Sequence, residues 1–191
     1  MRFLLGIIFL CSSLFSFSQG NNFKIYTLEE ALLTSPDSVF SIDLSRNKLY
    51  ELPKDLFRFT SLKSLNLSKN KLQTLGEDLS LLSQLETIDI SSNKFESLPA
   101  ALFQLEKVQQ LIAAKNEILK IQDEIQYMQS LREIDLYDNP VADIGSGLTK
   151  LKNLEKLDLR GVMYGPTFHQ FILSSLPNTR VKMDPPCTCM E

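Results

Sequence analysis

The sequence predicts an α/β solenoid in which successive coils each add one short parallel strand and a helix closes each end. Two observations lead to this prediction. Asparagine recurs every 23 residues through the middle of the chain, and apolar residues recur at the same interval on either side of it. Just before each asparagine, apolar and polar residues alternate, which is the pattern of a strand with one buried face. A repeat period of about 20 to 29 residues is typical of stacked coils that contribute one strand each.

The apolar columns define about six units and place them between residues 39 and 176. Two of these columns fall on the predicted strands, and both are expected to form a continuous internal core. The first column contains Ile42, Leu65, Ile88, Leu111, Ile134 and Leu157. The second column contains Leu44, Leu67, Ile90, Ala113, Leu136 and Leu159.

Residues 1–18 are predicted to be a signal peptide that is removed from the mature protein. A positive start and a short apolar stretch precede a small-residue site, so cleavage is expected near Ser18/Gln19. The alternative is lipidation at Cys11, but the bulky Leu10 stands where lipoprotein signals have a small residue. The sequence therefore predicts a secreted or periplasmic protein without stable membrane insertion.

Residues 19–38 are predicted to form a helical cap in front of the first coil. The segment from Thr27 to Glu30 fits a capping box, in which the two residues satisfy each other's backbone N–H groups. The helix is expected to end before Pro36.

The asparagine series ends at Val162, and a different segment follows. Residues 177–191 are predicted to form a closing strand, which requires a final step of 24 residues, and a C-terminal tail. The segment between Val162 and residue 177 begins at Gly165 and suits a helix. This helix is expected to pack on the last coil through Phe168, Phe171, Ile172 and Leu176.

The recurring asparagines are predicted to be structural. An amide side chain carries both a donor and an acceptor, and each one lies where a strand turns inward. There it can satisfy backbone groups of its own coil and of the neighbouring coil that water does not reach. The last member is expected to matter less, because it lies near the end of the stack. The ladder consists of Asn47, Asn70, Asn93, Asn116 and Asn139.

Residues 39–176 resemble the leucine-rich repeat proteins, in the 23-residue variant whose second half reads L-P-x-x-L. Leu52-Pro53 and Leu98-Pro99 keep the dipeptide of that pattern. The resemblance implies a curved, horseshoe-shaped solenoid with its parallel strands on the concave face. It also implies that a partner binds to the concave face, whereas the partner itself does not follow from the fold.

One column of this face carries acidic or amide residues between the two apolar positions of each strand. Adjacent carboxylates would be about 4.8 Å apart, so the column either marks a cation or a basic partner or is the ordinary polar filling of this repeat. We favour the second interpretation, because exposed charge pairs contribute only about 0–1 kcal/mol. The column contains Asp43, Asn66, Asp89, Ile112, Asp135 and Asp158.

The fourth unit breaks this pattern. Ile112 occupies the column that is otherwise acidic or amide, Ala114 replaces a serine beside it, and Tyr137 follows in the next unit. Adjacent apolar and aromatic residues on a polar face predict a contact patch. The alternative is that the small Ala113 leaves a gap and the strand shifts to bury Ile112. The predicted partner-binding residues are Ile112, Ala114, Tyr137, Asp89, Asp135, Asp158 and Arg160.

Composition excludes several other classes of function. The chain has 191 residues and a net charge of -3, which gives no reason to expect a nucleic-acid partner. Its single histidine, His169, lies in the C-terminal cap, so a His-dependent triad or a His-rich metal site is not expected. The sequence predicts no enzymatic activity, no metal site and no cofactor.

Cys187 and Cys189 are the remaining reactive pair. In an oxidising compartment they can close on each other, form an intermolecular disulfide or remain free. Their one-residue spacing would make a strained internal loop, so we interpret them as part of a tail without a metal or redox function.

The predicted function is a secreted or cell-envelope module that binds another protein with its concave face. The alternative is an envelope structural or adhesion component that binds a surface glycan through many weak contacts.

Overall fold

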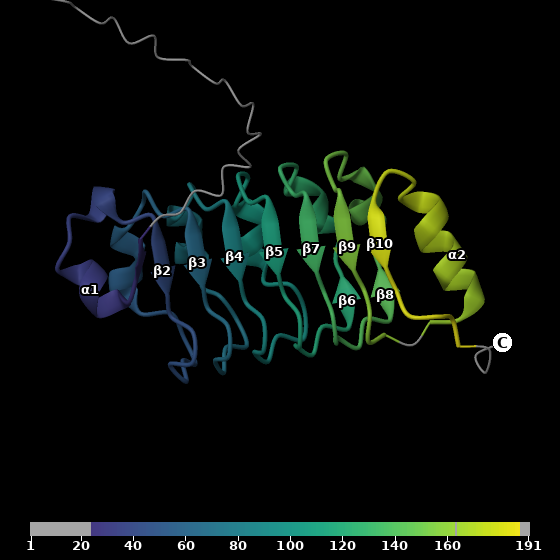
Figure 1. The fold of residues 1–191 in the computed structure, drawn as a ribbon, viewed down its shortest axis with the longest axis horizontal. Coiled ribbons are helices and arrows are strands. Elements are labelled where there is room, and N and C mark those ends of the chain that lie inside the picture. The colour runs from purple at the N-terminus through teal and green to yellow at the C-terminus, as the bar shows by residue number, and fades with distance from the viewer. Residues whose placement is uncertain (1–23, 163, 188–191) are drawn as a thin grey trace, which may run out of the picture.

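The computed structural model describes residues 24–162 and 164–187, and its main feature is a parallel sheet of eight strands (Figure 1). Every pair of neighbouring strands is parallel. This sheet, with one strand from each coil, confirms the α/β solenoid. In spatial order the strands are β1 (Ile25–Tyr26), β2 (Ser41–Asp43), β3 (Ser64–Asn66), β4 (Thr87–Asp89), β5 (Gln110–Ile112), β7 (Glu133–Asp135), β9 (Lys156–Asp158) and β10 (Arg180–Lys182).

The 23-residue period sets the register of the sheet. Ile42 lies opposite Leu65, Leu65 lies opposite Ile88, and the same step continues to Leu157. The last step is 24 residues, from Leu157 to Val181, so the predicted lengthening of the closing step is confirmed.

The outer side of each coil is a short 3-10 helix, which the sequence analysis did not predict. Each of the five 3-10 helices from η2 to η6 buries an apolar residue at the same repeat position, namely Leu56, Leu79, Leu102, Ile125 and Leu148, and η4 also buries Ala101. One tight turn is enough to bury one side chain and return the chain to the next strand. The turns are η1 (Pro36–Ser38), η2 (Lys54–Arg58), η3 (Glu77–Leu81), η4 (Ala100–Gln104), η5 (Asp123–Tyr127) and η6 (Ser146–Lys150).

A second, two-stranded sheet joins the later coils. It pairs β6 (Lys120–Ile121) with β8 (Asp143–Ile144) in parallel. An ion pair of 2.7 Å between the Lys120 ammonium and the Asp143 carboxylate lies on the same two strands.

One hydrophobic core runs through the whole array between the main sheet and the 3-10 helices. Its fully buried members include Ile88, Ile90 and Phe95. Ala113 is buried as well, so the fourth coil keeps the same inward position as its larger neighbours despite the small side chain.

The helix α1 (Leu28–Leu32) lies at the first coil. The Glu30 N–H donates to the Thr27 hydroxyl at 3.2 Å, and the Thr27 N–H donates to the Glu30 carboxylate at 3.0 Å, which completes the predicted capping box. The helix ends before Pro36, as expected. The strand β1 in front of it was not predicted, because a two-residue strand leaves no periodic pattern in the sequence.

The helix α2 (Pro166–Ser175) lies at the opposite end of the array from α1 (Figure 1). Ile172 and Leu176 are buried, and the ring of Phe168 stacks on the ring of Tyr164 with centroids 4.4 Å apart. Phe171 was expected to pack on the last coil, and this expectation is wrong, because its side chain is 48% exposed. Phe171 lies about 100° around the helix from Ile172, at the edge of the buried face, and its ring contacts that of Phe168 with centroids 6.5 Å apart.

Several predictions fall outside the described residues. These are the signal peptide over residues 1–18, its cleavage near Ser18/Gln19, the alternative at Cys11, and Cys189. Among the described residues, no helix is long and apolar enough to cross a membrane.

Candidate functional site

The asparagine ladder fixes the coils that carry the site. The Asn93 amide donates to the carbonyls of Leu67 and Ile90, both at 3.0 Å, and its oxygen accepts the N–H of Leu72 at 3.0 Å. Asn70, Asn116 and Asn139 make the equivalent bonds. Each asparagine therefore binds its own coil and the coil before it.

Asn47 does not take part in the ladder, which corrects its predicted role. Its side chain is exposed and makes no hydrogen bond to any residue in the described part of the chain. The other ladder asparagines each donate to a carbonyl of the preceding coil, and Asn47 belongs to the first coil. The step from β1 to β2 is 16 residues, so the segment before the first coil does not repeat the groups that Asn47 would need. Asn139, in contrast, is 1% exposed and has the full set of bonds.

The polar column of the concave face closes the end of each strand. The Asp43 carboxylate accepts the N–H of Ser45 at 2.7 Å, two residues further on. Four other column residues accept from the same position at 2.8–3.2 Å: Asn66, Asp89, Asp135 and Asp158. This local turn is a structural use of the column and supports its interpretation as ordinary filling. No cluster of potential metal ligands occurs within residues 24–162 or 164–187.

Ile112 is the column residue that has no acceptor atom. The N–H of Ala114, which would be its hydrogen-bond partner, finds no side-chain acceptor among the described residues. The strand nevertheless keeps its register, with Ile112 opposite Asp135 and Ala113 buried in the core. The alternative in which the strand shifts to bury Ile112 is therefore wrong. Ile112 remains half-buried on the concave face, whereas Ala114 is only 8% exposed and offers little contact area.

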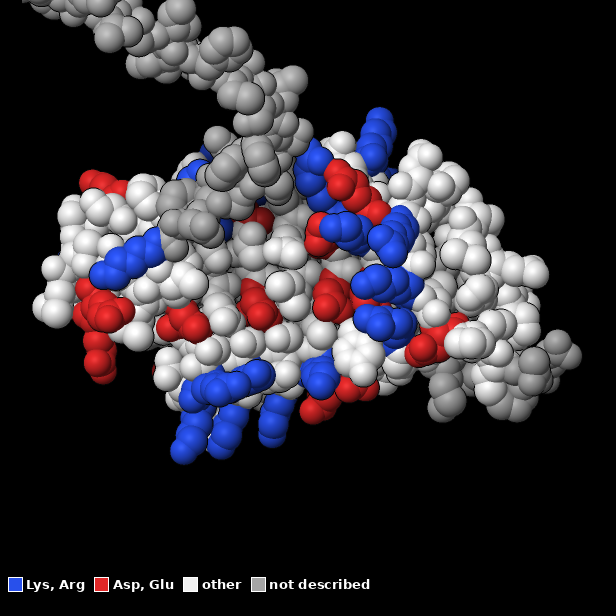
Figure 2. Space-filling view, in the orientation of Figure 1, with Lys and Arg blue, Asp and Glu red and all other residues white. Residues whose placement is uncertain are grey.

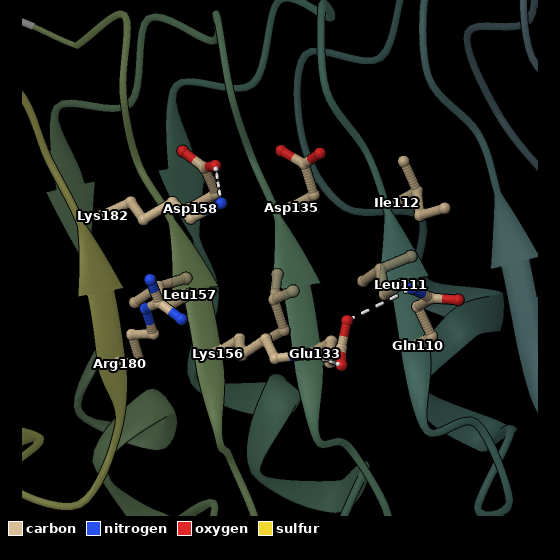
Figure 3. Close-up of a pocket in the computed structure, with 11 residues that line it drawn as sticks. Gln110, Leu111, Ile112, Glu133, Asp135, Lys156, Leu157, Asp158, Arg180 and Lys182 are labelled. Atoms are coloured by element: carbon tan, nitrogen blue, oxygen red, sulfur yellow. Dashed lines mark hydrogen bonds and ion pairs between the residues drawn. The ribbon is translucent and has the colours of Figure 1, made fainter. Parts of the chain in front are cut away.

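A shallow hollow of about 400 Å³ lies next to Ile112 on the second half of the concave face. Figure 3 shows its side chains in two rows across β5, β7, β9 and β10. One row runs from Ile112 through Asp135 and Asp158 to Lys182, and the other from Gln110 through Glu133 and Lys156 to Arg180.

Ion pairs across coils organise the charged side of the hollow. Lys156 pairs with Glu133, and the Lys182 ammonium lies 3.6 Å from the Asp158 carboxylate. The Arg160 guanidinium also donates two hydrogen bonds to Asp158, at 2.9 and 2.7 Å. Burial acts to raise the pKa of Asp158, but the hydrogen bonds and charge of Arg160 outweigh it and lower the pKa below its ordinary value.

Tyr137 lies beside the hollow between two cations. The Arg160 guanidinium is 5.4 Å from the centre of the Tyr137 ring, and the Lys115 ammonium is 5.8 Å from it. Such contacts restrain an exposed ring without covering it. The side chain of Tyr137 is 37% exposed and remains accessible.

The structure thus brings most of the predicted residues together. Ile112, Asp135 and Asp158 line the hollow, and Asp89 lies next to Ile112 in the register. Five other residues that line the hollow were not predicted as site residues, namely Gln110, Glu133, Lys156, Arg180 and Lys182. The first three occupy the strand position two residues before the polar column, which was visible in the repeat. Arg180 and Lys182 could be aligned only with the 24-residue final step.

Cys187 is disulfide-bonded, so the free thiol, one of the three states considered for this cysteine, is excluded. Cys187 is half-buried at the end of the described chain, where its N–H donates to the carbonyl of Tyr164 at 2.8 Å. Nothing in this arrangement supports an intermolecular disulfide.

Comparisons with known proteins concern the fold. A family model described as a leucine-rich repeat region matches residues 41–181. The crystal structure of internalin C2 from Listeria monocytogenes has a TM-score of 0.63 and 22% identity, over 76% of this chain and 61% of that one. A leucine-rich repeat protein of Leptospira interrogans has a TM-score of 0.45 and 19% identity, over 84% of this chain and 58% of that one. The chain therefore spans about three-fifths of each of these structures. No curated protein matches the sequence.

Proposed function

Because the chain belongs to the leucine-rich repeat family, we propose that it is a non-catalytic interaction module that binds another protein with the second half of its concave face. Repeat proteins of this kind typically act through protein–protein interaction, because a stack of coils presents an extended surface. The proposed contact surface contains Ile112, Tyr137, Asp135, Asp158 and Arg160, with Asp89 at its edge.

The observation that carries this proposal is the loss of the turn acceptor at Ile112. Five of the six coils place an acidic or amide side chain at this position and use it to bind the backbone two residues on. The fourth coil lacks that bond and places a half-buried apolar side chain on the concave face instead. A residue that breaks a local rule without benefit to its own fold is expected at a functional site.

The surroundings of Ile112 support a protein ligand. Binding energy in protein interfaces concentrates on a few apolar, aromatic and arginine side chains that are surrounded by polar groups. Ile112, Tyr137 and Arg160 supply these three types, and the ion-paired groups of the hollow supply a polar rim.

Ile112→Asp tests the proposal. The new carboxylate restores the acceptor for the Ala114 N–H, so the free energy of unfolding should stay the same or rise by about 0.5–1 kcal/mol. Affinity for the partner, captured from the native envelope or medium with mature protein and then titrated, should fall at least tenfold, or by about 1.4 kcal/mol.

Asn66→Asp is the matched control for this variant. It adds the same carboxylate to the same column two coils away and keeps its bond to the Ser68 N–H. It should leave affinity unchanged. Loss of stability in Ile112→Asp would assign Ile112 to the core, and unchanged affinity at unchanged stability would move the binding surface away from the hollow.

We further propose that the module acts outside the cytoplasm. The support is the sequence of residues 1–18, with its positive start, apolar stretch and small-residue site. Intact-mass measurement on protein from the native host should give a chain that begins near Gln19. A lipidated Cys11 at the N-terminus would instead place the protein on a membrane surface.

A further inference from the structure

A row of basic side chains follows one edge of the first three coils, away from the hollow. Five residues form this basic edge, namely Arg46, Lys48, Lys69, Lys71 and Lys94, and all of them are exposed. They come from two positions of the repeat, the residues just before and just after the asparagine. Figure 2 shows blue side chains that project together along the lower edge of the molecule, beneath the early strands.

These cations are not neutralised by the chain itself. None of the five forms an ion pair with a described residue, whereas Lys63, Lys120, Arg132, Lys156, Arg160 and Lys182 each pair with an acid. Glu51 and Glu96 are near in sequence but do not reach ion-pair distance within the described structure. The basic edge therefore carries a local positive charge on a chain whose net charge is -3.

The Tyr50 hydroxyl lies in this positive field, which affects its pKa. The Lys71 ammonium donates a hydrogen bond to the Tyr50 hydroxyl at 2.9 Å and lies 5.0 Å from the centre of its ring. That hydrogen bond, the charge of Lys71 and the charge of Lys94 lower the pKa of the Tyr50 hydroxyl below its ordinary value. The phenol adds a polar group to the edge without cancelling its charge.

The backbone also indicates that the basic side chains are not a consequence of the fold. Arg46, Lys48 and Lys69 have φ angles of 60°, 56° and 58°, a left-handed conformation in which glycine is less strained. At the repeat position of Arg46 and Lys69, the other coils keep a positive φ with different residues, namely Ser92, Lys115, Asp138 and Gly161. The first coils thus carry long basic side chains where the backbone alone would favour glycine.

We propose that the basic edge binds a linear polymer that bears sulfate or phosphate groups. Successive coils present their cations at about the strand spacing of 4.8 Å, so a chain of regularly spaced anions can contact several of them at once. Four of the five residues are lysines, whose compact charges suit repeated anions without a fixed geometry. Binding of this kind releases counterions and depends steeply on salt.

The ends of the basic edge favour a polymer over a flat anionic membrane. At the same two repeat positions, the fourth coil has Lys115 and Glu117, and the fifth has Asp138 and Pro140. A flat surface along this edge would also meet Glu117 and Asp138 and be repelled by them. A polymer can instead follow the first three coils and turn away from the acids.

The test compares two variants with the same change in net charge. The edge variant carries Lys48→Gln, Lys69→Gln, Lys71→Gln and Lys94→Gln. The control variant carries Lys54→Gln, Lys107→Gln, Lys150→Gln and Lys152→Gln, all exposed and outside both the edge and the hollow. Affinity is measured at several salt concentrations for a size-defined heparin oligosaccharide, for polyphosphate of defined length and for vesicles of anionic phospholipid.

The wild-type protein should bind at least one of the two polymers. A comparison of its affinities for heparin and for polyphosphate shows whether sulfate or phosphate is the preferred anionic group. The edge variant should lose at least tenfold in affinity. Its affinity should also depend less on salt: the magnitude of the slope of log K against log salt should decrease by about 2–3, at about 0.7 for each lost contact. The control should lose less than twofold. Equal loss in both variants, absence of polymer binding, or binding to vesicles alone would overturn the proposal. Ile112→Asp should keep polymer binding, because the inference does not rest on the concave site.

Discussion

The two halves of the concave face share one backbone and differ in what their side chains do. In β2, β3 and β4 the column residues Asp43, Asn66 and Asp89 are used by their own coils to close the turn. In β5, β7 and β9 the corresponding surface has lost one such acceptor, and its charged groups pair across coils, as Lys156 does with Glu133. The register is the same throughout, so differences between equivalent positions of the two halves reflect side-chain chemistry rather than a change of fold.

The outer side of the array shows a related contrast, and it gives the largest expected effect. A methyl group added to Gly147, in η6, would lie 2.0 Å from the carbonyl oxygen of Asp123 in the coil before it. The same addition to Gly76, at the start of η3, would meet no atom within 4 Å. The late 3-10 helices η5 and η6 therefore approach each other more closely than a side chain at position 147 allows.

Gly147→Ala should destabilise the protein by about 2–3 kcal/mol, because the added methyl group overlaps the backbone of the neighbouring coil, which must shift to accept it. Gly76→Ala should be neutral or raise the free energy of unfolding by up to about 1 kcal/mol, because the folded backbone is unstrained and the unfolded chain loses freedom. Urea denaturation of both variants measures the difference. Similar midpoints for the two variants would contradict the close approach of η5 and η6 at position 147.

The asparagine ladder gives the next largest effect and separates the first coil from the others. Asn93→Ala should reduce the free energy of unfolding by about 1–3 kcal/mol, because it leaves buried carbonyl and N–H groups without partners. Asn139→Ala should cost a similar amount, since Asn139 makes the same bonds.

Asn47→Ala is the matched control and should change stability by less than about 0.5 kcal/mol, as expected for an exposed site. Chemical denaturation of the three variants decides the matter. A cost at Asn47 equal to that at Asn93 would contradict the conclusion that the ladder bonds run toward the preceding coil.

The sequence predicted the repeat and its register because each column recurs at a constant interval, and even Val181 could be placed once the last step was lengthened. It did not predict the 3-10 helices or β1, since single turns and two-residue strands leave no period of their own. The asparagine pattern is identical at all five positions, so the exception at Asn47 depends on what precedes the first coil, which no repeat position encodes.

The candidate site was predicted only in part, because the sequence shows which residues deviate from a repeated column but not how they pack. Ile112 and Tyr137 departed from their columns, and a departure is visible without a structure. Whether Ile112 faced the core or the surface depended on whether Ala113 left the strand in place, and this required packing to be known. Arg180 and Lys182 fall beside Lys156 and Asp158 once the final step is lengthened to 24 residues, but the two polar rows were not extended across that step.

The smallest expected effect concerns Asp158, where the second half differs from the first by an ion pair. The Arg160 guanidinium holds the pKa of the Asp158 carboxyl below its ordinary value, so the charged form is favoured in the folded protein. This stabilisation is fully present above the unfolded pKa, near 4, and is lost as pH falls through the lower pKa of the folded state.

Asp158→Asn removes the charge but can keep the turn acceptor for the Arg160 N–H. At pH 7 it should be less stable than wild type by less than about 1 kcal/mol, because the pair is partly exposed. The difference should shrink as pH falls below about 4 and disappear once the folded wild-type carboxyl is also protonated, below its lowered pKa. Asp43→Asn, at the same repeat position without a basic partner among the described residues, should show a smaller loss at pH 7. Denaturation midpoints between pH 2 and 7 compare the two variants, and parallel curves for both would assign Asp158 the same purely local role as Asp43.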